Sequence, residues 1–420
     1  MLRGIRKEFL RRSREDERGL GSIGTFVNLL NEVGVYPPFI TISEGVNEPQ
    51  CVIGGEEFLL FSSNNYLSLS EDPRVKEAAK AAIDRYGIGP GASRCLAGDI
   101  TVIRDAERVI ASHIGTEDCL TFPTGYMVNV TLFQALLEPF FLGMPCEKGS
   151  AEVFYDELNH GSIRDGILLT SAKKTPYRHA DLADLERKLA ASDSANRLIV
   201  TEGVYCLEGE ITPVPDYIAL KTKYGAWLLV DDAHGVGVVG EHGGGVGEHF
   251  GCAGDIDLLM GSMDKAFGGT GGYVGASRDT ISFLRIACRS SLLSSALPCI
   301  MASAVIEGID IARHDRQRRS RMNANAKYLR EGLRSQGFRV LGEAAIPSLA
   351  LYVGDEYLAM EFAEKLFERR IFASAFRWPA TPQGKARIRL VTMANHTQDH
   401  LDRLLVATNE IGHELNMLGE

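Results

Sequence analysis

Residues 227–234 read WLLVDDAH, an apolar run that ends in two acids and a histidine. A short apolar run of this kind is typical of a buried strand. In parallel α/β sheets, ligands collect at the carboxyl ends of the strands. An acid placed there, Asp231, can pair with a heterocyclic nitrogen and keep it protonated. The stretch alone leaves a second interpretation open, a helix N-cap aspartate followed by a surface histidine.

Other short apolar runs predict further buried strands on either side of this one. They are Leu120–Phe122, Val153–Tyr155, Leu198–Thr201 and Leu258–Met260. Helix-length amphipathic segments, such as Asp181–Ala191 and Asp216–Tyr224, lie between several of them. This alternation of strand and helix patterns predicts an α/β domain with a mostly parallel sheet.

We expect three parts along the chain: an N-terminal helix and arm over residues 1–60, a large domain over 61–297 and a smaller α+β domain over 298–420. The arm ends in a strand-like stretch with a Gly54-Gly55 turn. Glycines mark the ends of two predicted helices. The further predicted elements are a strand-like stretch Gln50–Ser62, helices Arg74–Tyr86, Ile103–Ile114 and Glu356–Arg369, a helical stretch from Pro298 to about Gln336, and strands Ser348–Val353 and Ala386–Val391.

Composition excludes several classes of protein. The net charge of −10 over 420 residues gives no electrostatic support for a nucleic-acid partner. No apolar run approaches the roughly 20 residues that span a bilayer, and the N-terminus lacks an apolar signal core, so we expect a cytoplasmic protein. The eight cysteines include no CxxC pair, which indicates reduced thiols rather than a disulfide framework or a zinc site.

A lysine follows the last predicted strand of the sheet. Residues 261–272 read GSMDKAFGGTGG, and their glycines permit close backbone approach to a ligand. The amine of Lys265 can form a Schiff base with an aldehyde, and the hydroxyl of Ser262 can bind a phosphate. Most single lysines are solvated surface charges. The functional interpretation therefore depends on the pairing of Lys265 with Asp231 and His234 upstream.

Two more motifs occur at strand ends. Residues 122–129, FPTGYMVN, include Thr124, Gly125 and Tyr126 at a strand-to-helix junction, where backbone amides form an anion site. Residues 156–162, DELNHGS, place His160 where it could lie flat against a planar cofactor. An ordinary turn and a capping turn, respectively, are the alternatives.

Two stretches of the sequence resemble known binding motifs, but we do not interpret either as a binding site. Residues 235–240, GVGVVG, match a dinucleotide fingerprint by letter, but they run into more glycines instead of a helix. Glu241-His242 and Glu248-His249 lack a third credible metal ligand, so we predict no metal site.

In this order along the chain, the motifs resemble the α-oxoamine synthases, fold-type I pyridoxal-phosphate (PLP) enzymes that make aminoketones. The resemblance covers nearly the whole chain. It extends from residues 62–67 (SSNNYL) through 91–94 (GASR), 202–205 (EGVY), 265–268 (KAFG) and 272–273 (GY) to His396-Thr397. It implies a large domain with a mostly parallel sheet of the seven-stranded type and a smaller C-terminal α+β domain.

The resemblance also implies a role for each matching residue. Lys265 would be the Schiff-base lysine, Asp231 would bind the pyridinium nitrogen, and His234 would bind the ring hydroxyl. His160 would stack on the ring. The other implied residues are Thr124, Gly125, Tyr126 and Ser262 around the phosphate, Ser294 or Ser295 from a partner subunit of a homodimer, Glu202 on the cofactor side, and Asn65 and Tyr66 on the substrate side.

Within the group, residues 377–382 (RWPATP) and the later Arg389 resemble serine palmitoyltransferase. In that subgroup the two corresponding arginines engage the substrate carboxylate, so Arg377 and Arg389 are the carboxylate candidates. The chain also departs from the family. Asp264 stands where a serine or threonine is usual, and residues 138–150 include extra sequence.

The resemblance implies a decarboxylating condensation of L-serine with a long-chain acyl-CoA, giving 3-ketosphinganine. Alanine, glycine or cysteate in place of serine, and an acyl-carrier-protein donor, remain open. A PLP aminotransferase is a rival, whereas a non-catalytic subunit is disfavoured because Lys265 is present. The basic N-terminal segment, residues 1–16, is predicted to be a helical arm on the dimer, with peripheral membrane contact as the alternative.

Overall fold

The computed structural model describes residues 22–32, 43–45, 48–138, 147–342 and 346–418. It separates into two compact units, residues 1–44 with 52–57, and residues 45–51 with 58–420. In the first unit, helix α2 (Ile23–Glu32) precedes β1 (Ser43–Glu44), which pairs antiparallel with Val52 and Ile53. The helix predicted over residues 1–16 lies outside the described residues, and so does most of the extra sequence near residue 140.

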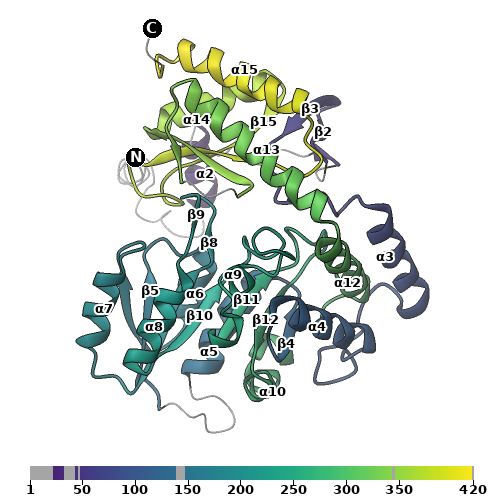
Figure 1. The fold of residues 1–420 in the computed structure, drawn as a ribbon, viewed down its shortest axis with the longest axis vertical. Coiled ribbons are helices and arrows are strands. Elements are labelled where there is room, and N and C mark those ends of the chain that lie inside the picture. The colour runs from purple at the N-terminus through teal and green to yellow at the C-terminus, as the bar shows by residue number, and fades with distance from the viewer. Residues whose placement is uncertain (1–21, 33–42, 46–47, 139–146, 343–345, 419–420) are drawn as a thin grey trace. The chain divides into compact units, whose positions relative to one another are not determined.

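The second unit is built around a seven-stranded sheet with the order β4-β12-β11-β10-β7-β5-β6 (Figure 1). All contacts among β11, β10, β7, β5 and β6 are parallel, while β12 is antiparallel to both of its neighbours. The predicted mostly parallel sheet is confirmed. Its strands are β4 (Asp118–Phe122), β5 (Ala151–Asp156), β6 (Lys173–Tyr177), β7 (Asn196–Glu202), β10 (Trp227–Asp231), β11 (Leu258–Ser262) and β12 (Gly272–Ala276).

Strand side chains alternate between two hydrophobic layers because successive residues of a strand point to opposite faces. In β10, Leu229 packs with helices α5 and α6, whereas Leu228 and Val230 pack with α4, α7 and α12 on the other face. Both faces are thus covered, as expected for a parallel sheet. The helices around the sheet are α3 (Pro73–Tyr86), α4 (Thr101–Ile114), α5 (Gly125–Leu137), α6 (Gly161–Leu168), α7 (Leu182–Ala190), α8 (Val214–Tyr224), α9 (Val246–His249), η3 (Ala253–Asp255), α10 (Arg278–Ala287), α11 (Arg289–Leu293) and α12 (Cys299–His314).

Two helix ends follow the predicted glycine signals, and the start of α3 has an N-cap that was not predicted. Asp72 caps α3 by accepting a hydrogen bond from the backbone N–H of Arg74, and Gly87 and Gly115 end α3 and α4 with positive φ angles of 77° and 78°. The helical stretch predicted from Pro298 to Gln336 is two helices, α12 and α13 (Arg316–Ser335). The break lies at Asp315, whose side chain caps α13 at the N–H of Arg318.

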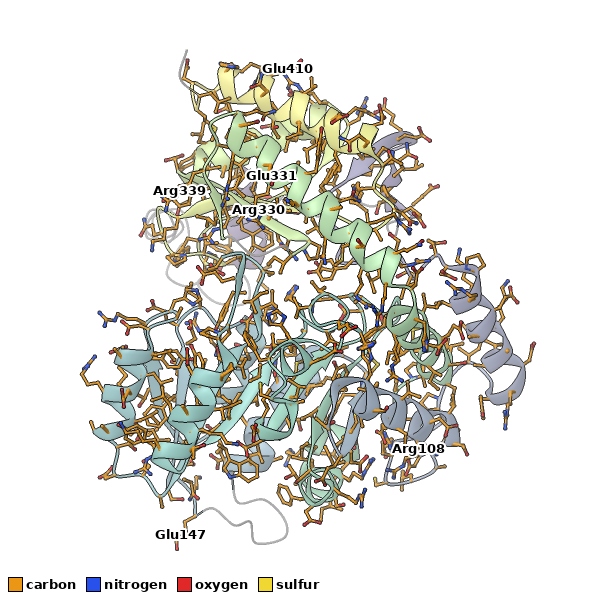
Figure 2. The ribbon with its side chains drawn as sticks, viewed as in Figure 1. Arg108, Glu147, Arg330, Glu331, Arg339 and Glu410 are labelled. Atoms are coloured by element: carbon orange, nitrogen blue, oxygen red, sulfur yellow. The ribbon has the colours of Figure 1, made fainter. Side chains whose placement is uncertain are left out.

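A second, four-stranded antiparallel sheet follows, with the order β13-β14-β17-β16. Arg330 attaches α13 to this sheet, because its Nη1 donates to the carbonyl oxygens of Leu341 and Gly342 at 2.8 and 3.0 Å (Figure 2). The predicted domain boundaries at 60/61 and 297/298 stay a prediction. The remaining elements are β13 (Val340–Leu341), β14 (Ser348–Gly354), α14 (Glu356–Glu368), β15 (Ile371–Phe372), β16 (Ser374–Phe376), β17 (Ala386–Val391) and α15 (Gln398–Glu414), together with β2 (Gln50–Ile53) and β3 (Glu56–Leu60), whose last two residues pair with β15.

A small hairpin of β8 (Val204–Tyr205) and β9 (Glu210–Ile211) joins the two sheets (Figure 1). It follows β7 directly and contacts the second sheet through backbone and side chains. The Oγ of Ser348 donates to the carbonyl of Cys206 at 2.9 Å, and Nη1 of Arg387 lies 2.8 Å from Oε1 of Glu208. No helix in the described part of the chain has the length and apolarity needed to cross a membrane.

Candidate active site

Two acids lie side by side where parallel strands end. Asp231 ends β10 and is the register neighbour of Glu202, which ends β7. Asp231 accepts hydrogen bonds from Nδ2 of Asn129 at 2.8 Å and from the N–H of Ala233 at 3.1 Å. Donors of this kind suit an ionised carboxylate.

Glu202 has the opposite environment. Burial, together with the negative charge of Asp231, raises the pKa of Glu202 well above its usual range. Its Oε1 accepts the N–H of His160 at 2.6 Å. The two neighbouring acids therefore lie in different environments, because burial and Asp231 favour the neutral form of Glu202, whereas Asp231 accepts hydrogen bonds from Asn129 and Ala233.

Asn129 connects Asp231 to the predicted stacking histidine. Its Nδ2 also donates to Oγ of Ser162 at 3.0 Å, and that Oγ lies 2.7 Å from Nδ1 of His160. Since Ser162 accepts from Asn129, its own hydroxyl proton is available to Nδ1 of His160. This network fixes the position of His160, which follows β5, relative to Asp231 at the end of β10.

His234 takes part in a second network. Its Nδ1 lies 2.6 Å from Oη of Tyr66, and Nη2 of Arg389 lies 3.4 Å from the same Oη. Burial, then the positive charges of Lys265 and Arg389, lowers the pKa of His234 well below its usual range. Burial raises the pKa of Tyr66 well above its usual range. A neutral histidine therefore accepts the phenol proton at Nδ1 and carries its own proton on Nε2.

Lys265 lies in the turn after β11. The turn is closed by the N–H of Met263, which donates to the carbonyl of Gly271 at 2.9 Å. Glycines pack closely against the residues after the lysine. A Cβ on Gly237 would lie 2.2 Å from Cβ of Ala266, and one on Gly308 would lie 2.3 Å from the carbonyl oxygen of Phe267. The backbone around Lys265 is thus tightly held, while its positive charge reaches His234.

The predicted anion site is at the N-terminus of α5. Oγ1 of Thr124 caps the helix by accepting the N–H of Met127 at 3.2 Å. Gly125 begins the helix, and a Cβ there would lie 3.4 Å from Oγ of Ser262. The Ser262 hydroxyl therefore faces the first turn of α5, where backbone N–H groups lack helical partners. Tyr126 is exposed, and its Oη donates to Asp165 at 2.7 Å.

Arg389 is the buried cation of the site. Its Nε donates to Oγ of Ser348 at 3.0 Å and its Nη2 donates to Oδ1 of Asn64 at 2.7 Å. Among the described residues, no carboxylate lies within ion-pair distance of Arg389. Asn64, which belongs to the quoted residues 62–67 but was given no role, contacts the arginine, whereas Oδ1 of its neighbour Asn65 accepts the N–H of Leu69 at 3.0 Å.

The other predicted residues lie on nearby segments. Arg377 directly follows β16, whose Ser374 is the register partner of Arg389. Ser294 and Ser295 follow α11, and the next residue, Ala296, donates its N–H to the carbonyl of Ala92. No group of three or more histidine, cysteine or acidic side chains suited to a metal ion occurs among the described residues. Residues 235–245 form turns rather than a helix, which agrees with rejecting the dinucleotide fingerprint.

Sequence reasoning missed the supporting polar residues: Asn64, Asn129, Ser162 and Ser348. Asn129 and Ser162 were within the quoted motifs, so their polar side chains next to predicted strand ends were a usable signal. Ser348 had none, because its position beside Arg389 depends on the pairing of β14 with β17.

These residues fit PLP. The cofactor needs an amine for its aldehyde, a carboxylate for its ring nitrogen and hydrogen-bond donors for its phosphate. Lys265, Asp231 and the first turn of α5 offer these groups at one edge of the sheet. Glycine packing supports the phosphate end, since a Cβ on Gly272 would lie only 2.5 Å from Cα of Gly125.

Comparison with known proteins agrees with the geometry. The family model for class I and II aminotransferases matches residues 56–407. The chain is 39% identical to 8-amino-7-oxononanoate synthase of Thermoanaerobacter pseudethanolicus over 391 residues, which cover 93% of this chain and 96% of the relative.

Solved structures are similar over most of the chain. A serine palmitoyltransferase variant from S. paucimobilis with a bound PLP–myriocin aldimine has a TM-score of 0.88 at 30% identity, covering 96% of this chain and 100% of that one. An 8-amino-7-oxononanoate synthase from Francisella tularensis has a TM-score of 0.71 at 25% identity, covering 85% and 98%. The chain therefore belongs to the class I and II aminotransferase family and, within it, is a PLP-dependent α-oxoamine synthase.

Proposed function

We propose that this enzyme condenses L-alanine with a seven-carbon dicarboxylic acyl thioester, releasing carbon dioxide and the free thiol. The proposal for the substrates rests on the relatives. In 8-amino-7-oxononanoate, the amine on carbon 8 and the terminal carbon 9 correspond to alanine after loss of its carboxylate. Carbons 1 to 7 then come from the acyl group.

The observation that carries the amino-acid substrate is the buried guanidinium of Arg389. A buried charge is costly unless an opposite charge meets it. The α-carboxylate of an amino acid supplies that charge, and a guanidinium binds a carboxylate through paired hydrogen bonds. Arg377, at the end of the adjacent strand, is proposed as the second group that contacts this carboxylate.

We propose the remaining roles from the resemblance to the family, and the contacts of the site support them. When bound, PLP supplies an electron-accepting ring that stabilises negative charge on the α-carbon of the amino acid. Lys265 would hold the cofactor by its amine and, when released from it, would move the proton at the α-carbon. Asp231 would keep the ring nitrogen protonated. His234 would donate from Nε2 to the ring hydroxyl, and His160 would lie on the ring face.

A second candidate is L-serine with a long-chain acyl thioester. It is favoured by the TM-score of 0.88 to serine palmitoyltransferase and by the RWPATP motif before Arg389. The relatives at 39% identity favour alanine over the serine predicted from sequence. The assay compares CoA thioesters with carrier-protein thioesters to identify the acyl carrier.

A homodimer is the proposed assembly. Three large apolar side chains, Ile88, Leu96 and Leu293, are 73%, 77% and 72% exposed. Two of them lie on segments in contact, since Sγ of Cys95 donates to the carbonyl of Leu292 at 3.4 Å. An exposed apolar patch of this kind indicates a protein interface. Ser294 or Ser295, next to this patch, would reach the partner subunit's phosphate site.

The test is thiol release with a panel of amino acids and acyl thioesters. L-Alanine with heptanedioyl-CoA should give the highest kcat/KM, with one carbon dioxide released per thiol. Faster release with L-serine and palmitoyl-CoA would replace the first candidate by the second. Amino-group exchange with a keto acid and no thiol release would contradict both.

A further inference from the structure

The anion site at α5 contains a carboxylate of its own. Asp264 lies two residues after Ser262, and Oγ of Ser262 donates a hydrogen bond to Oδ1 of Asp264. The same Oγ is 3.4 Å from the carbonyl oxygen of Gly271 and faces the first residue of α5. The hydroxyl expected to bind the cofactor's phosphate is therefore already committed.

A serine hydroxyl has one proton to donate. It can donate to Asp264 or to a phosphate oxygen, but not to both at once. The carboxylate also brings a negative charge next to a phosphate group that carries about −1.5 to −2 charges at neutral pH. Like charges in such proximity weaken binding. Asp264 thus acts against phosphate binding in two ways.

The charge of Asp264 also affects the pKa of Tyr66. Burial is the largest cause that raises this pKa, and the negative charge of Asp264 is a smaller one. Asp264 itself is exposed, so its carboxylate can rotate into solvent, and the buried Ser262 hydroxyl then keeps the carbonyl oxygen of Gly271 as an acceptor at 3.4 Å. The arrangement can switch between a state with Ser262 bound to Asp264 and a state with Ser262 released.

We propose that Asp264 competes with the phosphate of PLP for the Ser262 hydroxyl, so that the enzyme holds its cofactor loosely and exchanges it. This inference rests on the proposed placement of the phosphate at α5. It makes Asp264 a residue that sets cofactor affinity and takes no part in the reaction itself.

The experiment measures PLP affinity by titrating the cofactor-stripped full-length chain and following bound PLP after equilibrium dialysis. Asp264→Asn and Asp264→Ser should each bind PLP about tenfold more tightly, equivalent to roughly 1.4 kcal/mol. Asp84→Asn, the same change of charge at an exposed position on α3, is the matched control and should leave the affinity unchanged. Circular dichroism checks that each variant is folded.

Two further arms identify the cause. Ser262→Ala should weaken PLP binding more in an Asp264→Ala background than in the natural chain, because alanine offers no acceptor and leaves the Ser262 hydroxyl free for the phosphate. Pyridoxal, which lacks the phosphate, should bind all Asp264 variants equally. Equal or weaker PLP binding by both Asp264 variants, or an equal gain for pyridoxal, would overturn the inference. A natural chain that binds no PLP would instead overturn the cofactor site and this inference with it.

Discussion

Oη of Tyr66 lies 2.6 Å from Nδ1 of His234, and this contact connects a residue before the first helix of the large sheet to the end of β10. Arg389, the proposed carboxylate-binding residue, donates to the same Oη at 3.4 Å. The phenol therefore joins the amino-acid end of the site to the cofactor end. Its proton decides which nitrogen of His234 can donate to the cofactor.

Tyr66→Phe removes that proton. Without the phenol donor, His234 can take the other tautomer, so we expect kcat to fall about tenfold, the scale of one hydrogen bond. The pH dependence of the bound cofactor's absorbance should shift as well. Tyr328→Phe is the control, because it removes a hydroxyl that donates a hydrogen bond to Asp402 at an exposed position. Unchanged absorbance and kcat in Tyr66→Phe would contradict the connection.

Lys265→Ala should reduce turnover by more than about a thousandfold, the scale seen when a covalent catalytic group is lost. The measurement is intact mass after borohydride reduction. The natural chain should gain the mass of one reduced cofactor, and the variant should gain none. Lys327→Ala, at an exposed position of α13, should behave as the natural chain. A reduced cofactor attached to Lys265→Ala would show that another amine holds PLP.

Arg389→Gln should raise the KM for the amino acid about a hundredfold, because a charge-assisted hydrogen-bonded pair is lost. The KM for the acyl thioester should stay nearly constant. Arg389→Lys keeps the charge without the paired donors, so its KM for the amino acid should lie between those of the natural chain and Arg389→Gln. Arg339→Gln, directly before β13, removes a guanidinium that stacks over Tyr352 and controls for the loss of an arginine next to the second sheet. A larger effect on the thioester KM would place the acyl group, not the amino acid, at Arg389.

Gly235→Ala should destabilise the fold. A Cβ on Gly235 would lie 1.9 Å from Oδ1 of Asp232, a fully buried side chain. We expect the free energy of unfolding to fall by about 2 kcal/mol, as for overpacking in a core. Urea denaturation measures it. Gly254→Ala, where a Cβ would meet nothing within 4 Å, should change it by less than about 0.5 kcal/mol. Equal stability of the two variants would show that the Asp232 pocket relaxes freely.

His179 makes stability depend on pH. Burial alone would lower its pKa, but the hydrogen bond to Asp156 at 3.0 Å and the nearby Glu210 raise the pKa of His179 to about 10. A folded pKa above the unfolded value means that the stabilisation is complete below about pH 6.5 and is lost as the pH rises towards 10.

His179→Asn should therefore cost most at low pH. The loss of unfolding free energy should be about 1 to 2 kcal/mol near pH 6, the scale of a hydrogen bond to a charged group, and should shrink by pH 10. Denaturation of both proteins at several pH values measures the difference. His413→Asn, on the exposed side of α15, should show no such trend. A difference that grows with pH would mean that His179 is neutral in the folded protein.

Local patterns were sufficient for much of the large sheet. Each apolar run that predicted a strand contains the middle of an observed one, and Gly87 and Gly115 end helices as expected. Two strands were missed. β6 reads KKTPY, with little apolar signal, and β12 lies in a glycine run that resembles a loop. Its Gly272 is required by packing against Gly125, a contact between segments far apart in the chain.

Some active-site residues could likewise be predicted from local sequence patterns, and others could not. Lys265, Asp231 and His160 could be found because each follows an apolar strand and so belongs to one edge of a parallel sheet. The partners of Arg389 could not, because Asn64 and Ser348 lie far from Arg389 in the sequence and contact its side chain only in the fold. The pairing of β14 with β17 brings Ser348 to Arg389. Sequence resemblance also pointed to serine, whereas the relatives' names favour alanine.

The β8–β9 hairpin has a mechanical consequence. A Cβ on Gly342 would lie 2.1 Å from the carbonyl oxygen of Gly209, so the hairpin and the start of the second sheet touch backbone to backbone. No layer of side chains separates them over which one could slide. An opening between the two sheets would therefore rotate about this contact. Ser348 lies beside the same hairpin, because its Oγ donates to the carbonyl of Cys206 and accepts from Nε of Arg389, so Arg389 would move little when the enzyme admits a large acyl group.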